Sequence, residues 1–294
     1  MPEPIFSRLA LIGIGLIGSS IALAARKAGV VGHVAIHSRT EKTLKRAEEL
    51  KLGDSFHADP AAAARAADCI IACVPVGASG EVAMAIASVL EPGAIVSDVG
   101  SVKASVIAQM KPHIPPGVHF VPAHPVAGTE YSGPDAGFAE LFQNRWCILT
   151  PPPDTAADAV GRLGDFWRAI GANVEVMSAA HHDLVLAITS HVPHLIAYTI
   201  VNTVSDLEAH MKAEVVKFAA SGFRDFTRVA ASDPVMWRDI FLANKEPVLE
   251  MLGRLYEDIA LLQKAIRFDD GETLQRVFAR SRQIRRSIVQ ARQD

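Results

Sequence analysis

Hydrophobic residues in the first 180 positions form short runs of strand length, separated by alanine-rich segments with helical spacing. Unbroken apolar runs are typical of parallel strands that are buried on both faces. The runs are Leu9–Ile14, His33–His37, Cys69–Val74, Ala94–Val99, His119–Pro122, Trp146–Thr150 and Asn173–Met177. The helical segments between them include Ile21–Ala28, Glu41–Lys51, Ser79–Leu90, Lys103–Met110 and Ala156–Ile170. This alternation predicts an α/β fold with a doubly wound, mostly parallel sheet of Rossmann type.

Strand signals stop after about Ser178, and long periodic stretches follow at Lys245–Arg267 and Thr273–Gln290. A chain of 294 residues is long enough for two domains. We therefore predict an α/β domain over residues 1–178 and an all-α domain over residues 179–294. The segment Leu184–Val204 is nearly uncharged, so it must be buried in a core or against another chain. A homodimer formed through the helical domain is the simplest solution, although the sequence does not specify its interface.

Charge and cysteine content exclude several classes of protein. The formal net charge is −3, with 29 basic and 32 acidic residues, so we do not expect a nucleic-acid partner. Cys69 and Cys73 lie on one predicted strand, about 13 Å apart at 3.3 Å per residue, which is too far for a disulfide. With Cys147 as the third cysteine, the chain has neither a disulfide framework nor a tetrahedral metal set. We expect a cytoplasmic protein without a metal cofactor.

The motif Gly13-Ile14-Gly15-Leu16-Ile17-Gly18 follows the first predicted strand and begins a helix. Its first glycine permits a tight turn, the second lets the backbone approach a pyrophosphate, and the third allows close packing of helix and strand. Phosphates bind well at a helix N-terminus, where N–H groups lack partners. The motif lies in an uncharged stretch, Leu9–Ala25, that resembles a targeting segment or a short membrane span. The glycine spacing favours a dinucleotide site, and we expect no membrane association.

The end of the second predicted strand bears on the choice of cofactor. Enzymes that use NAD usually carry an acidic residue there, which binds the ribose hydroxyls. This chain has Ser38, Arg39 and Thr40 instead. Their hydroxyls and guanidinium could bind a 2′-phosphate. The sequence therefore favours NADP+, with NAD+ as a possible alternative.

Three further blocks combine polar residues and glycines in apolar surroundings. The first two follow predicted strands, so we expect them at the carboxyl edge of the sheet, where open α/β sheets bind ligands. The blocks are Asp98–Lys103 (DVGSVK), His124–Glu130 (HPVAGTE) and Thr189–His194 (TSHVPH).

Together with the glycine motif and the run Gly222–Arg228 (GFRDFTR), these blocks resemble the prephenate/arogenate dehydrogenase family of tyrosine biosynthesis. The resemblance runs from about Leu9 to at least Trp237, in the family's order. It implies an oxidoreductase that decarboxylates prephenate to 4-hydroxyphenylpyruvate, or arogenate to tyrosine, while a hydride passes to NAD(P)+. Prephenate and arogenate share the ring and one carboxylate, so the sequence does not choose between them. It also leaves feedback inhibition by tyrosine open.

The resemblance assigns roles to particular residues. His124 matches the catalytic histidine, a neutral imidazole that accepts the proton of the ring hydroxyl. Ser101 matches a serine that binds this hydroxyl or orients the histidine. Arg228 matches the arginine that binds a substrate carboxylate. The remaining substrate-binding candidates are His194, His191, Glu130 and Asp225, the last of which could pair with Arg228 on a helix.

Two other interpretations remain open at this point. A β-hydroxyacid or 6-phosphogluconate-type dehydrogenase would also have a Rossmann domain followed by helices, but these enzymes typically use a lysine of the helical domain as acid and base. Here the helical domain has a histidine pair instead. A dinucleotide-binding regulatory module without catalysis is the other alternative, and an intact arrangement of His124, Ser101 and Arg228 would argue against it.

Overall fold

The computed structural model describes residues 3–129, 131–205 and 221–290. The chain forms two compact units, Met1–Lys245 and Glu246–Asp294, and each is described by itself. The first unit contains all the described strands together with the helices up to α11. The division at residue 178, which rests on the change from mixed to helical elements, stays a prediction.

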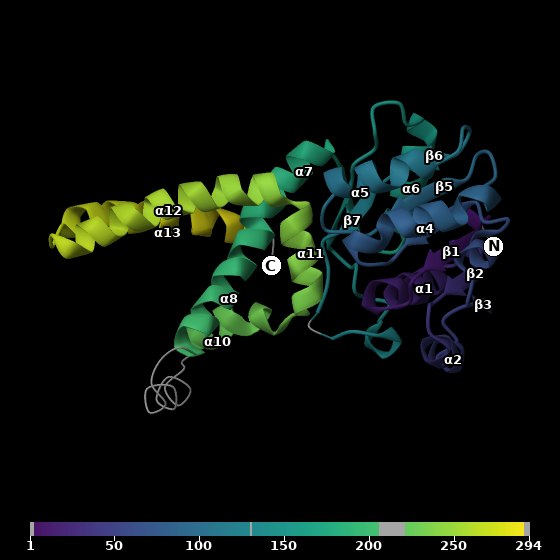
Figure 1. The fold of residues 1–294 in the computed structure, drawn as a ribbon, viewed down its shortest axis with the longest axis horizontal. Helices are drawn as coiled ribbons and strands as arrows, with labels where there is room; N and C mark the ends of the chain where they lie inside the picture. Colours follow the sequence, from purple (N-terminus) through teal and green to yellow (C-terminus); the bar gives the residue numbers. More distant parts are fainter. Residues whose placement is uncertain (1–2, 130, 206–220, 291–294) are drawn as a thin grey trace. The chain divides into compact units, whose positions relative to one another are not determined.

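A six-stranded sheet with strand order β3-β2-β1-β4-β5-β6 forms the centre of the first unit (Figure 1). Each neighbouring pair in this sheet is parallel in the described chain. The predicted doubly wound, mostly parallel sheet is therefore confirmed. Its strands are β1 (Phe6–Ile12), β2 (Val31–His37), β3 (Ser55–His57), β4 (Cys69–Ala72), β5 (Ile95–Asp98) and β6 (His119–Phe120).

Alternate residues of the central strands enter two separate cores. In β1, Leu9 and Leu11 pack in one core, and Ala10 and Ile12 pack in the other. This follows from the period of two in a strand, and burial on both faces explains the unbroken apolar runs. The first core includes α1 (Leu16–Ala28), α2 (Glu41–Glu49) and α6 (Ala157–Ala169), and the second includes α3 (Pro60–Ala64), α4 (Ser79–Ile86) and α5 (Ala104–Met110). Short 3₁₀ turns are η1 (Val76–Ala78), η2 (Ala87–Val89), η3 (Lys111–His113) and η4 (Pro134–Ala136).

A second, three-stranded sheet contains β7 (Ala123–Pro125), β8 (Trp146–Leu149) and β9 (Asn173–Val176). Strand β7 is antiparallel to β8, and β8 is parallel to β9. The single run predicted at His119–Pro122 ends at Phe120, and the chain then continues into this sheet. Pro122 lies at the junction, where its missing N–H could not extend the parallel ladder. This short β7 strand places His124 beside the main sheet.

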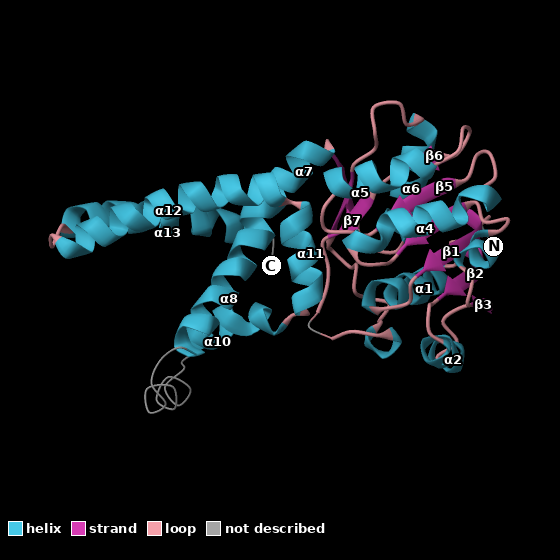
Figure 2. Ribbon diagram, viewed as in Figure 1, coloured by secondary structure: helices cyan, strands magenta, loops and turns pink. Residues whose placement is uncertain are grey.

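The rest of the first unit is helical (Figure 2). Its elements are α7 (Ala179–Leu186), the π-helical turn η5 (Ala187–His191), α8 (Val192–Ser205), α10 (Ser221–Thr227), the 3₁₀ turn η6 (Arg228–Ala231) and α11 (Pro234–Ala243). The π turn lies just before Pro193, whose ring disfavours a regular helix and whose nitrogen donates no hydrogen bond. Residues Ala179–Val204 have the length and mean hydropathy (1.6) of a membrane-spanning helix, and 28% of the most apolar window is buried among the described residues.

The second unit consists of two long helices, α12 (Lys245–Arg267) and α13 (Gly271–Gln290), joined by a short turn. The turn contains Asp269 in the left-handed region, with φ of 55°. These bounds agree closely with the periodic stretches predicted from the sequence. The helical character predicted after residue 178 is confirmed for the described residues.

Candidate active site

The glycine motif forms a turn in which two of its three glycines admit no other residue. Gly13 has φ of 105°, and a Cβ there would lie 2.3 Å from the carbonyl oxygen of Cys73. A Cβ on Gly18 would lie 2.3 Å from the carbonyl oxygen of Gly13. Both contacts are with backbone, which cannot move aside cheaply. The two glycines therefore close the turn between β1, β4 and α1.

Gly15 has the opposite environment, because a Cβ on it would meet no described atom within 4 Å. It caps α1 in an extended conformation, and the first turn of α1 contains no acidic residue. Leu16 and Ile17 begin the helix and are half-buried. The first N–H groups of α1 thus adjoin open space at a positive helix end, which suits a phosphate. This geometry fits the pyrophosphate of a dinucleotide.

The segment Ser38–Thr40 follows β2 directly, and its three side chains differ in how free they are to bind a 2′-phosphate. Thr40 is the N-cap of α2: its Oγ1 accepts a hydrogen bond from the Thr43 N–H at 3.3 Å and donates to Thr43 Oγ1 at 2.7 Å. Arg39 is exposed, and Ser38 is half-buried. A 2′-phosphate at this position could therefore contact the side chains of Ser38 and Arg39 most readily.

A buried ion pair connects the end of β5 to β7. The Lys103 ammonium contacts Asp98 and donates a 2.7 Å hydrogen bond to the carbonyl of Ala123. Asp98 accepts further hydrogen bonds from the N–H groups of Gly100 and Ala123. Because Lys103 and Asp98 are 0% and 1% exposed at their side chains, this pair is well shielded from water. It holds the residue before His124 against the carboxyl edge of the main sheet.

His124 belongs to a buried chain of three side chains. Its Nδ1 lies 2.8 Å from Nε2 of His182, and Nδ1 of His182 lies 2.8 Å from Oδ1 of Asp183. Asp183 also accepts hydrogen bonds from the N–H groups of Lys103 and Ala104, at 2.8 and 2.9 Å. Sequence reasoning missed His182 and Asp183. The adjacent histidines and aspartate at 181–183, just past the last strand, were the available signal.

Burial controls the protonation of His124. Desolvation lowers the pKa of His124 well below 6.5, and the nearby His182, Lys103 and His191 lower it further. Burial also lowers the pKa of His182, whereas its hydrogen bond to Asp183 acts in the opposite direction. Both imidazoles are therefore neutral at pH 7, so His124 can act as a base.

The predicted substrate residues His191 and His194 have different surroundings. His191 is fully buried, and its Nδ1 accepts a 3.0 Å hydrogen bond from the Asn244 side-chain amide. Burial lowers the pKa of His191 to about 4. His194 is half-buried and stacks on Trp237, with ring centroids 3.7 Å apart. The Nδ1 of His194 lies 2.8 Å from the carbonyl oxygen of Ser190, so this nitrogen carries the proton and Nε2 is left as an acceptor.

The other predicted residues lie around this cluster. Arg228 is exposed at the start of η6, which packs against α8, and its charge contributes to lowering the pKa of His194. Asp225 is exposed on α10, and its pairing with Arg228 stays a prediction. Ser101 is half-buried near the end of β5, while the side-chain hydrogen bond of His124 among the described residues is the one that it shares with His182. Glu130 lies outside the described residues.

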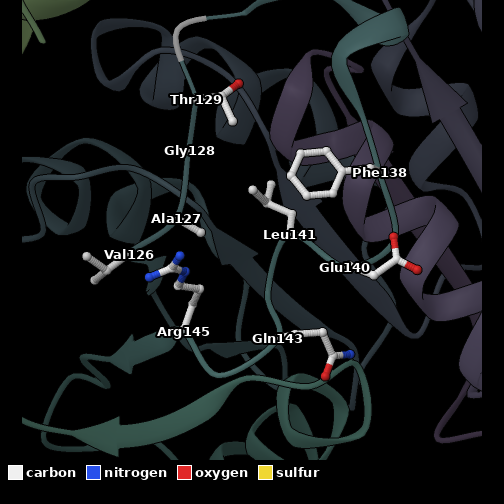
Figure 3. A pocket seen from close by; sticks show the side chains of 9 residues that line it. All are labelled: Val126, Ala127, Gly128, Thr129, Phe138, Glu140, Leu141, Gln143 and Arg145. Atoms are coloured by element: carbon white, nitrogen blue, oxygen red, sulfur yellow. The ribbon is translucent and has the colours of Figure 1, made fainter. Parts of the chain in front are cut away.

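A cavity of about 370 Å³ lies beside the segment that follows His124 (Figure 3). Residues Val126–Thr129 line one part of it, and Phe138 and Leu141 line another. The segment from η4 to Phe138 packs on α1, where the Phe138 N–H donates to Ser20 Oγ at 3.1 Å. Residues His124–Thr129 therefore run from the buried histidine to this cavity.

A Rossmann-type sheet, a glycine turn that fits a pyrophosphate and a neutral buried histidine define a nicotinamide-dependent dehydrogenase. Residues 21–176 match the family model of the prephenate dehydrogenase nucleotide-binding domain, and residues 178–280 match that of the prephenate dehydrogenase dimerization domain. The chain belongs to the prephenate dehydrogenase family, which confirms the resemblance inferred from its motifs.

Individual members of this family are similar to this chain over nearly its whole length. Cyclohexadienyl dehydrogenase of Zymomonas mobilis is 44% identical over 97% of this chain and 97% of that protein. Prephenate dehydrogenase of Bacillus subtilis is 34% identical over 94% of this chain and 74% of that protein. The solved structure of Aquifex aeolicus prephenate dehydrogenase with hydroxyphenyl propionate and NAD+ has a TM-score of 0.89 and 29% identity, covering 96% of this chain and 98% of that one. The solved structure of Synechocystis arogenate dehydrogenase has a TM-score of 0.82 and 26% identity, and the match covers 96% of this chain and 99% of that one.

The chain is thus an oxidoreductase of tyrosine biosynthesis. Its reaction is the oxidative decarboxylation of a cyclohexadienyl acid of the prephenate and arogenate class, with hydride transfer to a nicotinamide dinucleotide. The relatives do not favour the β-hydroxyacid dehydrogenase or the regulatory module considered as alternatives.

Proposed function

We propose that His124 is the general base of this reaction, acting on the ring hydroxyl of prephenate or arogenate. The observation that carries the proposal is the hydrogen bond between His124 Nδ1 and His182. With Nδ1 engaged there, Nε2 is the basic nitrogen available to a substrate. A neutral imidazole is required for this role, and the lowered pKa of His124 supplies it at pH 7.

In this reaction the bound nicotinamide of the dinucleotide supplies the hydride acceptor, and the residues of the chain bind the substrate and accept its proton. His124 accepts a hydrogen bond from the ring hydroxyl and takes its proton while the carbonyl forms. The resulting dienone loses carbon dioxide readily, because decarboxylation makes the ring aromatic. Ser101, which follows β5, would bind the same hydroxyl and orient the ring.

Substrate binding is assigned to Arg228 and His194, with His191, Glu130 and Asp225 as further candidates. A planar guanidinium suits bidentate binding of a carboxylate. The electrostatic influence of Arg228 on His194 supports a shared subsite for the two side chains. His194 presents Nε2 as a hydrogen-bond acceptor, because its Nδ1–H is committed to Ser190. Fully buried His191 would act through its neighbours rather than on the substrate directly.

We further propose that NADP+ is the favoured cofactor and NAD+ the alternative. Ser38 and Arg39 adjoin the end of β2, where a 2′-phosphate would lie, and no carboxylate occupies this segment. A guanidinium gains more from a dianionic phosphate than from a ribose hydroxyl. That the Aquifex aeolicus structure contains NAD+ is a property of that protein.

Steady-state kinetics with both dinucleotides and both acids tests the cofactor and the substrate together. We expect a higher kcat/KM with NADP+ than with NAD+. Arg39→Ala should lower kcat/KM for NADP+ and leave kcat/KM for NAD+ unchanged. The loss should be about tenfold for each 1.4 kcal/mol of phosphate binding that Arg39 contributes. Lys111→Ala is a matched control, because Lys111 is exposed beyond the C-terminal end of α5, at the opposite edge of the sheet. A clear preference for NAD+ would contradict the NADP+ assignment.

We also propose that the helical domain forms a homodimer and that the protein is cytoplasmic. The family model for residues 178–280 is a dimerization domain, and the apolar helix α8 leaves Val201 and other residues exposed in the single chain. Burial of such a face against a second copy removes apolar surface from water. Sedimentation at several concentrations should give twice the mass of the chain, and a monomer at micromolar concentration would contradict the proposal.

A further inference from the structure

The protonation of the chain His124–His182–Asp183 follows from its last member. The Asp183 carboxylate accepts hydrogen bonds, so Nδ1 of His182 must carry a proton and donate it. In a neutral His182 the other nitrogen, Nε2, is then an acceptor. His124 must therefore donate from Nδ1 to His182, which leaves Nε2 of His124 without a proton. One carboxylate thus determines the tautomers of two imidazoles.

We propose that His182 and Asp183 hold His124 in its basic tautomer and take up the proton that leaves the substrate hydroxyl. This inference rests on the role proposed above for His124. When Nε2 of His124 takes the hydroxyl proton, the O–H electron pair forms the carbonyl and the hydride leaves with the C–H electron pair. The Nδ1 proton of His124 then moves to Nε2 of His182. His124 is neutral again, and the positive charge rests on His182 beside the Asp183 carboxylate.

The proton returns in the second half of the reaction. When the dienone loses carbon dioxide, the electron pair of the broken C–C bond enters the ring and a phenolate oxygen results. The Nε2 proton of His124 passes to this oxygen, and the proton on His182 moves back to His124. The relay therefore ends as it began, and no proton is released to solvent. This balance matches a reaction whose products are a phenol, carbon dioxide and reduced dinucleotide.

The surroundings of the relay favour this direction of transfer. The nearby Lys103, His182 and His191 all disfavour a charged His124. Burial and the charge of Lys103 lower the pKa of His182 as well, but its hydrogen bond to Asp183 and the negative charges of Asp183 and Asp98 act in the opposite direction. His182 is the better resting place for a proton, because it alone of the two imidazoles touches a carboxylate. Buried Cys147, on β8, lies close to Lys103 and Asp98, and burial raises its pKa, so this thiol stays neutral.

The anchoring of Asp183 keeps the relay rigid. Its two oxygens accept N–H groups of Lys103 and Ala104 at the start of α5. Its carbonyl oxygen accepts a 2.9 Å hydrogen bond from the Asn244 amide at the end of α11. Asp183 and His182 are both fully or nearly fully buried, at 3% and 0% exposure. The relay therefore connects the Rossmann side, through α5, with the helical part of the unit.

Two substitutions of His182 separate the two roles of the relay. In His182→Gln, the amide oxygen can still accept from His124 and the amide nitrogen can donate to Asp183, but glutamine cannot hold the proton. In His182→Phe, both hydrogen bonds are lost. We expect kcat to fall by about 10-fold to 10²-fold for His182→Gln. The fall for His182→Phe should be larger, and it should lie within the roughly 10²–10⁴-fold that general-base catalysis contributes. KM for the acid should change little, because His182 is not expected to touch the substrate.

Histidine ¹⁵N NMR of the protein without ligands gives a readout that is independent of turnover. We expect Nδ1–H tautomers for His124 and His182 in the natural protein, retention of the His124 tautomer in His182→Gln, and a mixture in His182→Phe. His181→Gln is the matched control, because His181 is exposed on the same helix, one residue away. It should leave kcat and the His124 signals unchanged.

The outcomes distinguish this inference from the proposed function. If His124→Asn abolishes turnover but both His182 variants keep the natural kcat, the relay is wrong and the base assignment stands. If His124→Asn itself keeps the natural kcat, the base assignment is wrong. An Nε2–H tautomer of His124 in the natural protein would overturn the relay directly. Should His182→Phe fail to fold, His182→Gln decides alone, because it can retain both hydrogen bonds.

Discussion

Nδ1 of His124 lies 2.8 Å from Nε2 of His182, a residue 58 positions later in the chain. This contact joins β7, which follows the Rossmann sheet, to α7, the helix that follows the last described strand, β9. It explains how an imidazole in a short β7 strand keeps one orientation, since the ring is held at one nitrogen and its other nitrogen remains basic. The site therefore depends on both the α/β and the helical part of the first unit.

His124→Asn should lower kcat by about 10²–10⁴, the range lost when a general base is removed. Binding of the acid should persist, because the carboxylate contact assigned to Arg228 and the hydrogen bond to the Nε2 acceptor of His194 remain. The measurement is steady-state kinetics together with direct binding of the acid. A variant with natural turnover would show that another group takes the hydroxyl proton.

We expect substitutions of two glycines in the turn to have different effects, one on stability and the other on dinucleotide binding. Gly13→Ala places a Cβ against the Cys73 carbonyl at a φ of 105°, so we expect a loss of unfolding free energy of at least about 1–3 kcal/mol. Gly15→Ala meets no described atom and should fold normally. Its methyl group would instead enter the space proposed for the pyrophosphate and weaken dinucleotide binding. Urea unfolding and cofactor titration of both variants check this, and natural affinity in Gly15→Ala would contradict the phosphate site.

Lys103→Met should destabilise the fold by about 3–5 kcal/mol, because it leaves the buried Asp98 carboxylate without its cation. The double variant with Asp98→Asn should recover part of this loss, since no charge then remains buried. Lys27→Met is the control, because Lys27 pairs with Glu140 at the exposed surface and should matter little. Equal stability of the Lys103 and Lys27 variants in urea would refute a structural role for the buried pair.

Acid should destabilise the protein in part through His191. Burial lowers the pKa of His191 to about 4, whereas the unfolded chain has a value near 6.5. Between these values the unfolded state binds more protons than the folded state, so the unfolding free energy falls as the pH falls. The share due to His191 is at most about 3–4 kcal/mol, at about 1.4 kcal/mol for each pKa unit. His191→Gln should reduce the loss between pH 6.5 and 4, and an unchanged pH dependence would show that His191 ionises normally in the folded protein.

Local patterns were sufficient for much of the fold. The glycine motif and the apolar runs predicted the parallel sheet because both depend on neighbours in sequence. The edge strand β3, Ser55–His57, escaped prediction because it has three residues and little apolar character. The second sheet escaped because strand partners such as β7 and β8 are set by long-range pairing. A run of apolar residues does not specify which sheet a strand joins.

Site residues within a recognisable motif could be predicted from the sequence. Site residues whose role depends on a contact with a distant residue could not. His124 and Ser101 lie in blocks whose glycines and polar residues interrupt apolar strands. His182 and Asp183 lie in a helix beside the exposed His181, and only the packing of α7 against α5 shows which histidine is buried. The buried His191 likewise has its hydrogen-bond partner, Asn244, 53 residues away in the sequence.

The most direct test of the account is the simultaneous measurement of reduced dinucleotide and carbon dioxide from the purified protein. Prephenate and arogenate would each be supplied with NAD+ and with NADP+. We expect at least one combination to yield carbon dioxide and reduced cofactor in equal amounts, and His124→Asn to suppress both together. Absence of turnover with either acid in all four combinations would contradict it.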